Sequence, residues 1–300
     1  MRVRLGVLLL VGAMALGACG TEGEDPADGR TKVVAAFYPL FEAAQRVGGA
    51  HVQVTNVTPA GGEPHDIELS SRQLDRIEDA AVVLYFGHGF QPGLEKVAAR
   101  AKGTKVDLLS EAGTLLGAPP GDQELDVDPH VWLDPTLFKG MVTKVATALS
   151  RVDPANQGAY EANAAAYGRE LDDLDSAYRQ GLAQCDRKVI VTSHAAFGYL
   201  ARRYGLGQEA VAGLQPDAEP TPQRLAELAS QVRAQGTRTI FYETLVSPKV
   251  AQTLAREAGV STAALDPLEG LSDDALNAGA TYISVMRENL ATLRSALGCR

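Results

Sequence analysis

The sequence predicts an α/β protein of two lobes, each a parallel sheet flanked by helices, with one long helix between them. Short apolar runs alternate with amphipathic segments in both halves of the chain, and such strand–helix alternation implies parallel sheets covered by helices. The halves are separated by a stretch of about 30 residues that keeps a helical period and contains no strand. Hydrophobic residues make up 45% and charged residues 22% of the chain, which are ordinary values for a globular protein.

The first 18 residues are expected to be an export signal peptide. Arg2 and Arg4 precede an apolar run at residues 5–16, in the order that a signal peptide has its basic and apolar regions. This run is too short to cross a bilayer comfortably as a helix.

The apolar run ends in Leu16-Gly17-Ala18-Cys19, which resembles a bacterial lipobox, the motif whose cysteine is diacylated and becomes the first mature residue. An ordinary signal peptide followed by an incidental cysteine is the alternative. The residues after Cys19 have no apolar periodicity, so residues 19–30 are expected to form a lipidated, flexible tether.

The first lobe, residues 31–153, is predicted from four short apolar runs and the amphipathic segments between them. The expected strands are residues 32–37, 52–57, 81–86 and 105–109. The expected helices are residues 40–47, 70–79, 92–102 and 136–150. Ser70 or Ser71 is a suitable N-cap for the second of these helices.

A long helix is expected between the lobes, at residues 154–184. Its apolar positions are spaced 7, 4, 3, 4 and 4 residues apart, which is a helical period kept over about six turns. These positions are Tyr160, Tyr167, Leu171, Leu174, Tyr178 and Leu182. At 1.5 Å per residue such a helix is about 45 Å long, which is enough to brace two lobes.

The second lobe, residues 185–300, is predicted to repeat the alternation. The expected strands are residues 188–192, 239–242 and 260–265. The expected helices are residues 195–204, 221–235, 248–258 and 274–297. Pro222 begins one of these helices, and Gly205 and Gly259 end two others.

Charge and cysteine content narrow the possible functions. The net charge of −9 makes nucleic acid a poor partner, and no second apolar run approaches the 18 residues of a membrane-spanning helix. If Cys19 is lipidated, Cys185 and Cys299 remain, an even number in an oxidising compartment. They are expected to form a disulfide; two separate buried thiols are the alternative.

The candidate chemistry lies in histidines, of which the chain has five: His51, His65, His88, His130 and His194. His65 and His194 follow predicted strands, and parallel sheets place ligand sites at the carboxyl ends of their strands. His130 follows an irregular segment beside Pro129. An isolated histidine at a strand end more often has a capping or hydrogen-bonding role, but three together, each near Pro or Gly, favour a metal such as zinc. No compact metal motif is present.

Six segments in order along the mature chain resemble the zinc- and manganese-binding class of ABC-transporter solute-binding lipoproteins, most closely its zinc members. The segments are Gly62-Glu63-Pro64-His65-Asp66-Ile67-Glu68, Asp128-Pro129-His130-Val131-Trp132-Leu133-Asp134-Pro135, Ser193-His194-Ala195-Ala196-Phe197-Gly198-Tyr199, Glu219-Pro220-Thr221-Pro222, Phe241-Tyr242-Glu243 and Leu265-Asp266-Pro267-Leu268.

The resemblance implies a fold of two α/β lobes joined by one long rigid helix, with metal bound between them. The implied ligands are His65 and His130 from the first lobe and His194 and Asp266 from the second. Manganese members usually have Glu in place of His194, and the softer imidazole favours zinc. Asp266 also suits the simpler role of a turn residue before Pro267.

The resemblance also implies a function and partners. The protein is expected to deliver zinc to the permease of an ABC importer and not to be an enzyme. It is expected to be a monomer that is anchored by a lipid on Cys19 to the outer face of the cytoplasmic membrane. A manganese or iron transporter component and a zinc-dependent hydrolase are the alternatives. A hydrolase keeps an open position on its zinc, so a site filled by four protein ligands argues against it.

Residues around the ligands carry weaker expectations. Metal-bound histidine usually has a partner for its second ring nitrogen, and Glu219, Glu243 and His88 are the candidates. Salt bridges of the two glutamates to Arg224 or Lys249 are the alternative. Many zinc members have a long His-rich loop before the second ligand, but residues 117–128 are short, acidic and free of His, so metal collection by this loop is not expected.

Overall fold

The computed structural model describes residues 29–119, 122, 125–216 and 220–300. The expected signal peptide, Cys19, most of the expected tether and Glu219 lie outside the described residues. Among the helices that are described, none combines the length and apolar composition needed to cross a membrane.

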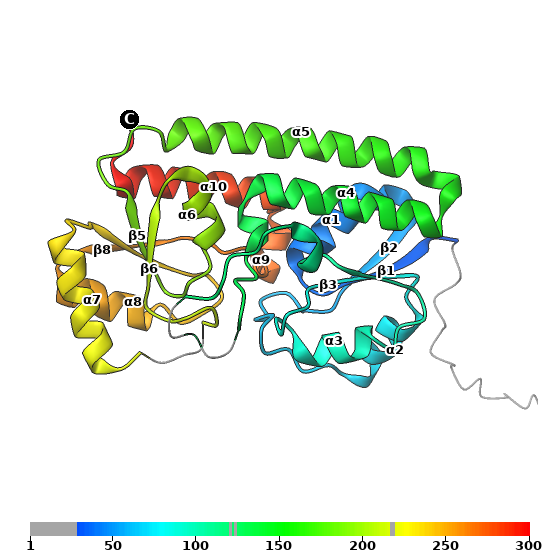
Figure 1. Ribbon diagram of the computed structural model, residues 1–300, viewed down its shortest axis with the longest axis horizontal. Coiled ribbons are helices and arrows are strands. Elements are labelled where there is room, and N and C mark those ends of the chain that lie inside the picture. The colour runs from blue at the N-terminus through cyan, green and yellow to red at the C-terminus, as the bar shows by residue number, and fades with distance from the viewer. Residues whose placement is uncertain (1–28, 120–121, 123–124, 217–219) are drawn as a thin grey trace, which may run out of the picture.

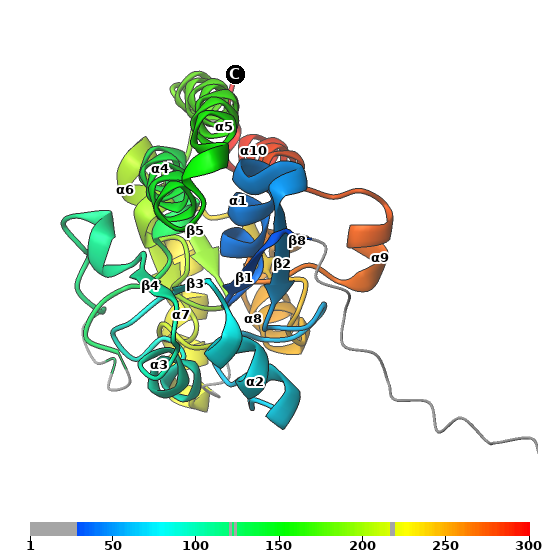
Figure 2. The ribbon, with the colours of Figure 1, turned by 90° about the vertical axis from the view of Figure 1, so that its right-hand side faces the viewer.

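The first sheet consists of β1 (Thr31–Ala35), β2 (Val52–Asn56), β3 (Val82–Tyr85) and β4 (Thr104–Asp107). Their order is β2-β1-β3-β4 and all neighbours are parallel. One face is covered by α1 (Tyr38–Gly48) and α4 (Pro135–Val152), and the other by α2 (Ser71–Asp79) and α3 (Pro92–Ala98), as Figures 1 and 2 show. The apolar runs predicted as strands are therefore buried on both faces, as parallel sheets require.

The second sheet repeats this topology. It consists of β5 (Val189–Thr192), β6 (Gly207–Ala210), β7 (Thr239–Tyr242) and β8 (Ser261–Ala264), in the parallel order β6-β5-β7-β8. Side chains alternate between its faces: Val191 packs in the core beneath α7 (Pro222–Ala234) and α8 (Lys249–Ala258). Ile190 packs in the opposite core, toward α6 (Gly198–Tyr204) and α10 (Tyr282–Leu297).

Three elements in the second half differ from the sequence prediction. Strand β6 was not predicted, because Gly-Gln-Glu-Ala has no apolar run and lies partly exposed at the sheet edge. The expected helix 195–204 begins only at Gly198, which leaves His194 in a loop. The expected helix 274–297 is two helices, α9 (Asp273–Asn277) and α10, because Gly279 adopts a left-handed conformation and Thr281 caps a new helix.

The expected long helix is present as α5 (Gln157–Gly181), preceded by the 3-10 turn Pro154–Asn156. All six apolar positions predicted from its spacing are buried. The helix is about 37 Å long at 1.5 Å per residue, and it runs past both sheets (Figure 1). It packs against α1 and α4 of the first half and α10 of the second.

A buried carboxylate joins the two halves below α5. Glu42 on α1 accepts hydrogen bonds from the hydroxyls of Tyr38 and Tyr167 and from the backbone N–H of Tyr282, the first residue of α10. The ring of Tyr282 stacks on Phe138 of α4, with 4.4 Å between the ring centroids. Burying a carboxylate is costly unless hydrogen bonds satisfy it, so these partners fix the start of α10 against the first half.

Cys185 and Cys299 form the expected disulfide, across 114 residues of sequence. It joins the segment after α5 to the segment after α10, at the end of the molecule where the C-terminus lies (Figure 1).

We expect replacement of both cysteines by serine to lower the free energy of unfolding by about 4 kcal/mol, because the cross-link restricts a long loop in the unfolded chain. Denaturant unfolding of protein that begins after Cys19 measures this loss, and wild-type protein unfolded with reductant should match the variant. Equal stability of the variant and the oxidised wild type would contradict the expectation.

Candidate metal centre

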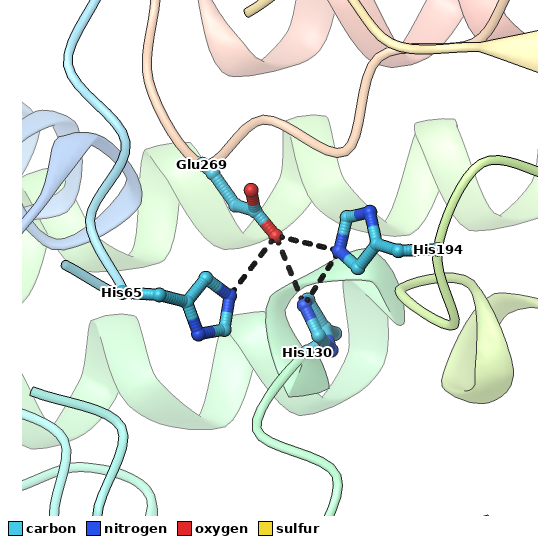
Figure 3. Close-up of side chains that lie close together, drawn as sticks. All are labelled: His65, His130, His194 and Glu269. Atoms are coloured by element: carbon cyan, nitrogen blue, oxygen red, sulfur yellow. Dashed lines mark hydrogen bonds and ion pairs between the residues drawn. The ribbon is translucent and has the colours of Figure 1, made fainter. Parts of the chain in front are cut away.

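Four side chains from four separate segments meet where the two halves face each other (Figure 3). His65 lies in the loop after β2, His130 before the 3-10 turn that leads into α4, His194 in the loop after β5, and Glu269 in the loop after β8. One nitrogen or oxygen from each lies within 4.8 Å of all the others. The side chains are at most 2% exposed, so the centre is enclosed by protein.

The spacing of these atoms suits a tetrahedral zinc ion. Glu269 Oε1 lies 2.9 Å from His130 Nε2, 3.1 Å from His194 Nε2 and 3.6 Å from His65 Nε2. The Nε2 atoms of His130 and His194 are 3.3 Å apart. Zinc ligands at about 2.0–2.1 Å from the metal are about 3.3 Å from one another in a tetrahedron, so these four groups need only small movements to surround an ion.

The ring of His130 is oriented by Asp128. Asp128 Oδ1 lies 2.8 Å from His130 Nδ1 and accepts a hydrogen bond from the His130 backbone at 2.9 Å. This partner favours a proton on Nδ1 and leaves Nε2 free to bind a metal. Asp128 Oδ2 packs on Gly198, where any Cβ would come within 2.6 Å of it, so glycine is required for this approach.

His194 has the same kind of partner in Glu243, at the end of β7. Glu243 Oε1 lies 2.7 Å from His194 Nδ1 and accepts from the His194 backbone at 3.2 Å. Glu243 therefore lies where the orienting role expected from the sequence requires it.

His65 is held by packing and by its loop. Its ring contacts Phe90, with 4.7 Å between ring centroids, and the preceding Pro64 carbonyl accepts a hydrogen bond from the buried Gln91 side chain. Neither ring nitrogen of His65 makes a hydrogen bond. A buried nitrogen that lacks a hydrogen bond and lies 3.6 Å from a carboxylate oxygen, as His65 Nε2 does, is an arrangement that a metal ion between them completes.

Burial and charge shift the pKa values of the centre in opposite directions. Burial alone disfavours each charged form, but the three imidazoles hold the pKa of Glu269 well below its usual range. Glu243 and Glu269 outweigh burial and raise the pKa of His194 well above its usual value. Asp128 and Glu269 outweigh burial at His130 and raise its pKa, whereas burial prevails at His65 and lowers its pKa. The carboxylates therefore favour the protonated imidazoles, and metal binding competes with protons at these rings.

A fifth acid lies beside the centre. Glu63 Oε1 accepts a hydrogen bond from the His65 backbone at 3.2 Å. Burial, followed by repulsion from Glu269, raises the pKa of Glu63 to about 9, so its neutral form prevails at neutral pH in the metal-free protein.

The expectation that Asp266 supplies the fourth ligand is corrected by this geometry. Its carboxylate accepts hydrogen bonds from Thr244 Oγ1, in the loop after β7, and from the backbone N–H of Leu268 in its own loop, each at 2.7 Å. Leu268 adopts φ 58°, and this turn directs Glu269 toward the imidazoles. The structure supports the alternative for Asp266, that of a turn residue before Pro267.

The remaining sequence candidates lie elsewhere. His88 is exposed, and its Nε2 lies 3.2 Å from the hydroxyl of Ser110, so it does not orient a ligand as expected. Asp128 and Glu269 were not among the site residues predicted from the sequence. For Asp128 the available signal was its place two residues before His130 in Asp-Pro-His. For Glu269 it was a carboxylate one residue beyond the family-like segment that ends at Leu268.

The chain is similar to known proteins along most of its length. The model of the family described as zinc-uptake complex component A, periplasmic, matches residues 33–296. The zinc-binding lipoprotein AdcA of Streptococcus pneumoniae is 38% identical over 299 residues, covering 96% of this chain and 60% of that protein. The high-affinity zinc uptake system protein ZnuA of Bacillus subtilis is 34% identical over 300 residues, covering 95% of this chain and 94% of that protein.

A solved structure has the same fold. The crystal structure of the Zn(II)-bound ZnuA-like domain of S. pneumoniae AdcA superposes with a TM-score of 0.77 at 39% identity, covering 90% of this chain and 99% of that domain. The chain thus spans about 60% of the length of the streptococcal relative, and nearly all of the Bacillus one.

The pKa shifts predict how the metal-free centre responds to pH. A raised His194 pKa adds stability that is fully present below the ordinary value of 6.5 and is lost as pH rises through the folded-state pKa. A lowered Glu269 pKa adds stability that is present above 4.5 and is lost as pH falls through the folded-state pKa. Glu269→Gln should therefore lower the pKa of His130 and His194 and weaken the metal-free fold between these limits.

Histidine NMR titration of metal-free protein measures the shift, since only five rings contribute signals. Glu68→Gln, which removes an exposed acid on the His65 loop, is the matched control and should leave the titration unchanged. Unchanged imidazole titration in Glu269→Gln would contradict the ion pairing described here.

Proposed function

The chain belongs to the family of periplasmic zinc-uptake complex components, and from that premise we propose that it captures one zinc ion outside the cytoplasm and delivers it to an ABC importer. The observation that carries the proposal is the enclosed meeting of three imidazoles and one carboxylate at zinc-like spacing. In this proposal His65, His130, His194 and Glu269 bind the metal, and Asp128 and Glu243 orient two of the rings.

The donor set supports zinc over manganese or iron as the cargo. Three imidazole nitrogens suit zinc, whereas manganese prefers carboxylate, carbonyl and water oxygens. A tetrahedral spacing also matches zinc better than the six-oxygen octahedron typical of manganese.

The same donor set argues against a zinc hydrolase. A catalytic zinc keeps one position for water or substrate, while structural and transported zinc can be surrounded by protein. In the proposed site, four protein atoms take the four positions of the tetrahedron, and the side chains that carry them are buried. No coordination position is then left for a water molecule that the zinc could activate.

The proposal extends to location and partners. Residues 1–18 act as the signal peptide, and Cys19 carries the lipid on the tether 19–30, in keeping with the lipoprotein name of the streptococcal relative. A first lobe, 31–153, and a second lobe, 185–300, flank the linker helix 154–184, and the monomer meets the membrane permease with zinc held between its lobes.

We expect His194→Ala and Glu269→Gln each to weaken zinc binding at least tenfold, about 1.4 kcal/mol, because each removes one of four ligands. Both should also lose most of the zinc-induced rise in melting temperature, which scales as RT ln(1 + [L]/Kd). Competition titration against a chromophoric chelator measures the affinities. His88→Ala, at an exposed histidine that is not among the four clustered ligands, is the matched control and should bind zinc like the wild type.

The same titration with manganese tests the cargo. The wild type should bind one zinc per chain and far less manganese. Equal or stronger manganese binding would refute the zinc assignment, and zinc binding of wild-type strength in both ligand variants would refute the site.

A further inference from the structure

The loop that carries Glu269 follows the last strand of the second sheet, yet it is bonded to the first half on both sides of the ligand. Two residues before Glu269, the carbonyl of Pro267 accepts a hydrogen bond from Trp132 Nε1 at 2.7 Å. Two residues after it, the carbonyl of Leu271 accepts from the backbone N–H of Gly61 at 2.9 Å. Glu269 is thus clamped at both flanks by groups that precede α5 in the chain.

Each clamp comes from a segment that carries another ligand. Trp132 lies two residues after His130, and Gly61 lies four residues before His65. The Gly61 loop also approaches Gly270 closely, since a Cβ at Gly270 would lie 3.2 Å from the Gly62 carbonyl oxygen. The three ligand segments of His65, His130 and Glu269 are therefore packed on one another directly.

The base of the Glu269 loop is tied to the same half through α10. Asn289 of α10 binds both the N–H and the carbonyl of Asp266, at 2.9 and 2.7 Å. The first residue of α10, Tyr282, donates its backbone N–H to Glu42 and its hydroxyl to the carbonyl of Trp132.

His194 is held differently. Within the described residues, its backbone bonds go to the second sheet: its carbonyl accepts from Thr192 and Gln208, and its N–H donates to Glu243. The polar contact of His194 itself with the first half is that of its Nε2 with His130 Nε2, and Tyr199, five residues further on, donates its hydroxyl to the Asp128 carbonyl.

We infer that Glu269 is mechanically a ligand of the first half, positioned by the Trp132 indole N–H whether or not metal is bound. The centre then divides three to one: His65, His130 and Glu269 form a preassembled set, and His194 is the single ligand that the second sheet brings. This inference rests on the proposed zinc site. Parting of the His194 bond alone would open one position on the ion, while the other three ligands still hold it.

A double-mutant cycle tests the positioning role. Trp132→Phe keeps an aromatic ring and removes the N–H donor, and we expect it to weaken zinc binding about tenfold, as loss of an orienting partner does. In the Glu269→Gln background the same substitution should change zinc affinity less than about twofold, because its effect passes through Glu269. Tyr178→Phe is the matched control: it also removes an aromatic donor to a buried carbonyl, that of Met286, and should leave zinc affinity unchanged.

The outcomes separate this inference from the proposed function. Absence of zinc binding by the wild type would refute the function itself. Normal binding by Trp132→Phe, or an equal loss in both backgrounds, would overturn the positioning role while leaving the zinc site intact.

A second measurement uses unmodified protein and does not depend on the folding of any variant. The chain has one tryptophan, so its indole N–H gives a single identifiable NMR signal. We expect slow hydrogen exchange at this N–H in both zinc-loaded and metal-free protein. Fast exchange in metal-free protein would show that the clamp depends on zinc and would overturn the inference.

Discussion

The buried carboxylate of Glu269 is the constraint on which the rest of the structure depends. A charged carboxylate enclosed by protein is strongly unfavourable unless positive charge or hydrogen bonds compensate it. In the metal-free state the imidazoles of His130 and His194, whose Nε2 atoms lie 2.9 and 3.1 Å from Glu269 Oε1, provide that compensation, and a bound zinc ion would take over this role. The centre is therefore stable in two forms, and both require ligands from the two halves to stay together.

The surrounding architecture keeps those ligands in place. Phe37, Phe90 and Trp132 pack together and present Trp132 to His130 and Phe90 to His65. Glu42 holds the start of α10, and α5 packs along helices of both halves. The contacts of Glu42 and of α5 join the two halves without involving the ligands. The distance between the sheets is therefore set largely by the fold, and the metal adjusts it only slightly. Such preorganisation lowers the entropic cost of binding a small ion.

The sequence predicted what periodicity and spacing can encode. The apolar face of α5 and seven of the eight strands in the described residues followed from the pattern of apolar residues. The three histidines followed from their positions after strands and beside proline. The strand β6 was missed because an edge strand without apolar residues has no such pattern. The fourth ligand was missed because Asp266 and Glu269 are both carboxylates in one loop, and the turn at Leu268 decides which of them faces the imidazoles. Backbone turns of this kind depend on tertiary contacts, here with Trp132 and Asn289, that no local pattern reveals.

The central claim is that protein atoms alone surround one zinc ion, drawn from both halves. X-ray absorption spectroscopy of the zinc-loaded protein tests it most directly. The account predicts four nitrogen or oxygen neighbours at about 2.0 Å, with the outer scattering of three imidazoles. Loss of one imidazole should follow from His194→Ala, and loss of none from His88→Ala. A wild-type spectrum with six oxygen-like neighbours, or with fewer than three imidazoles, would contradict the account.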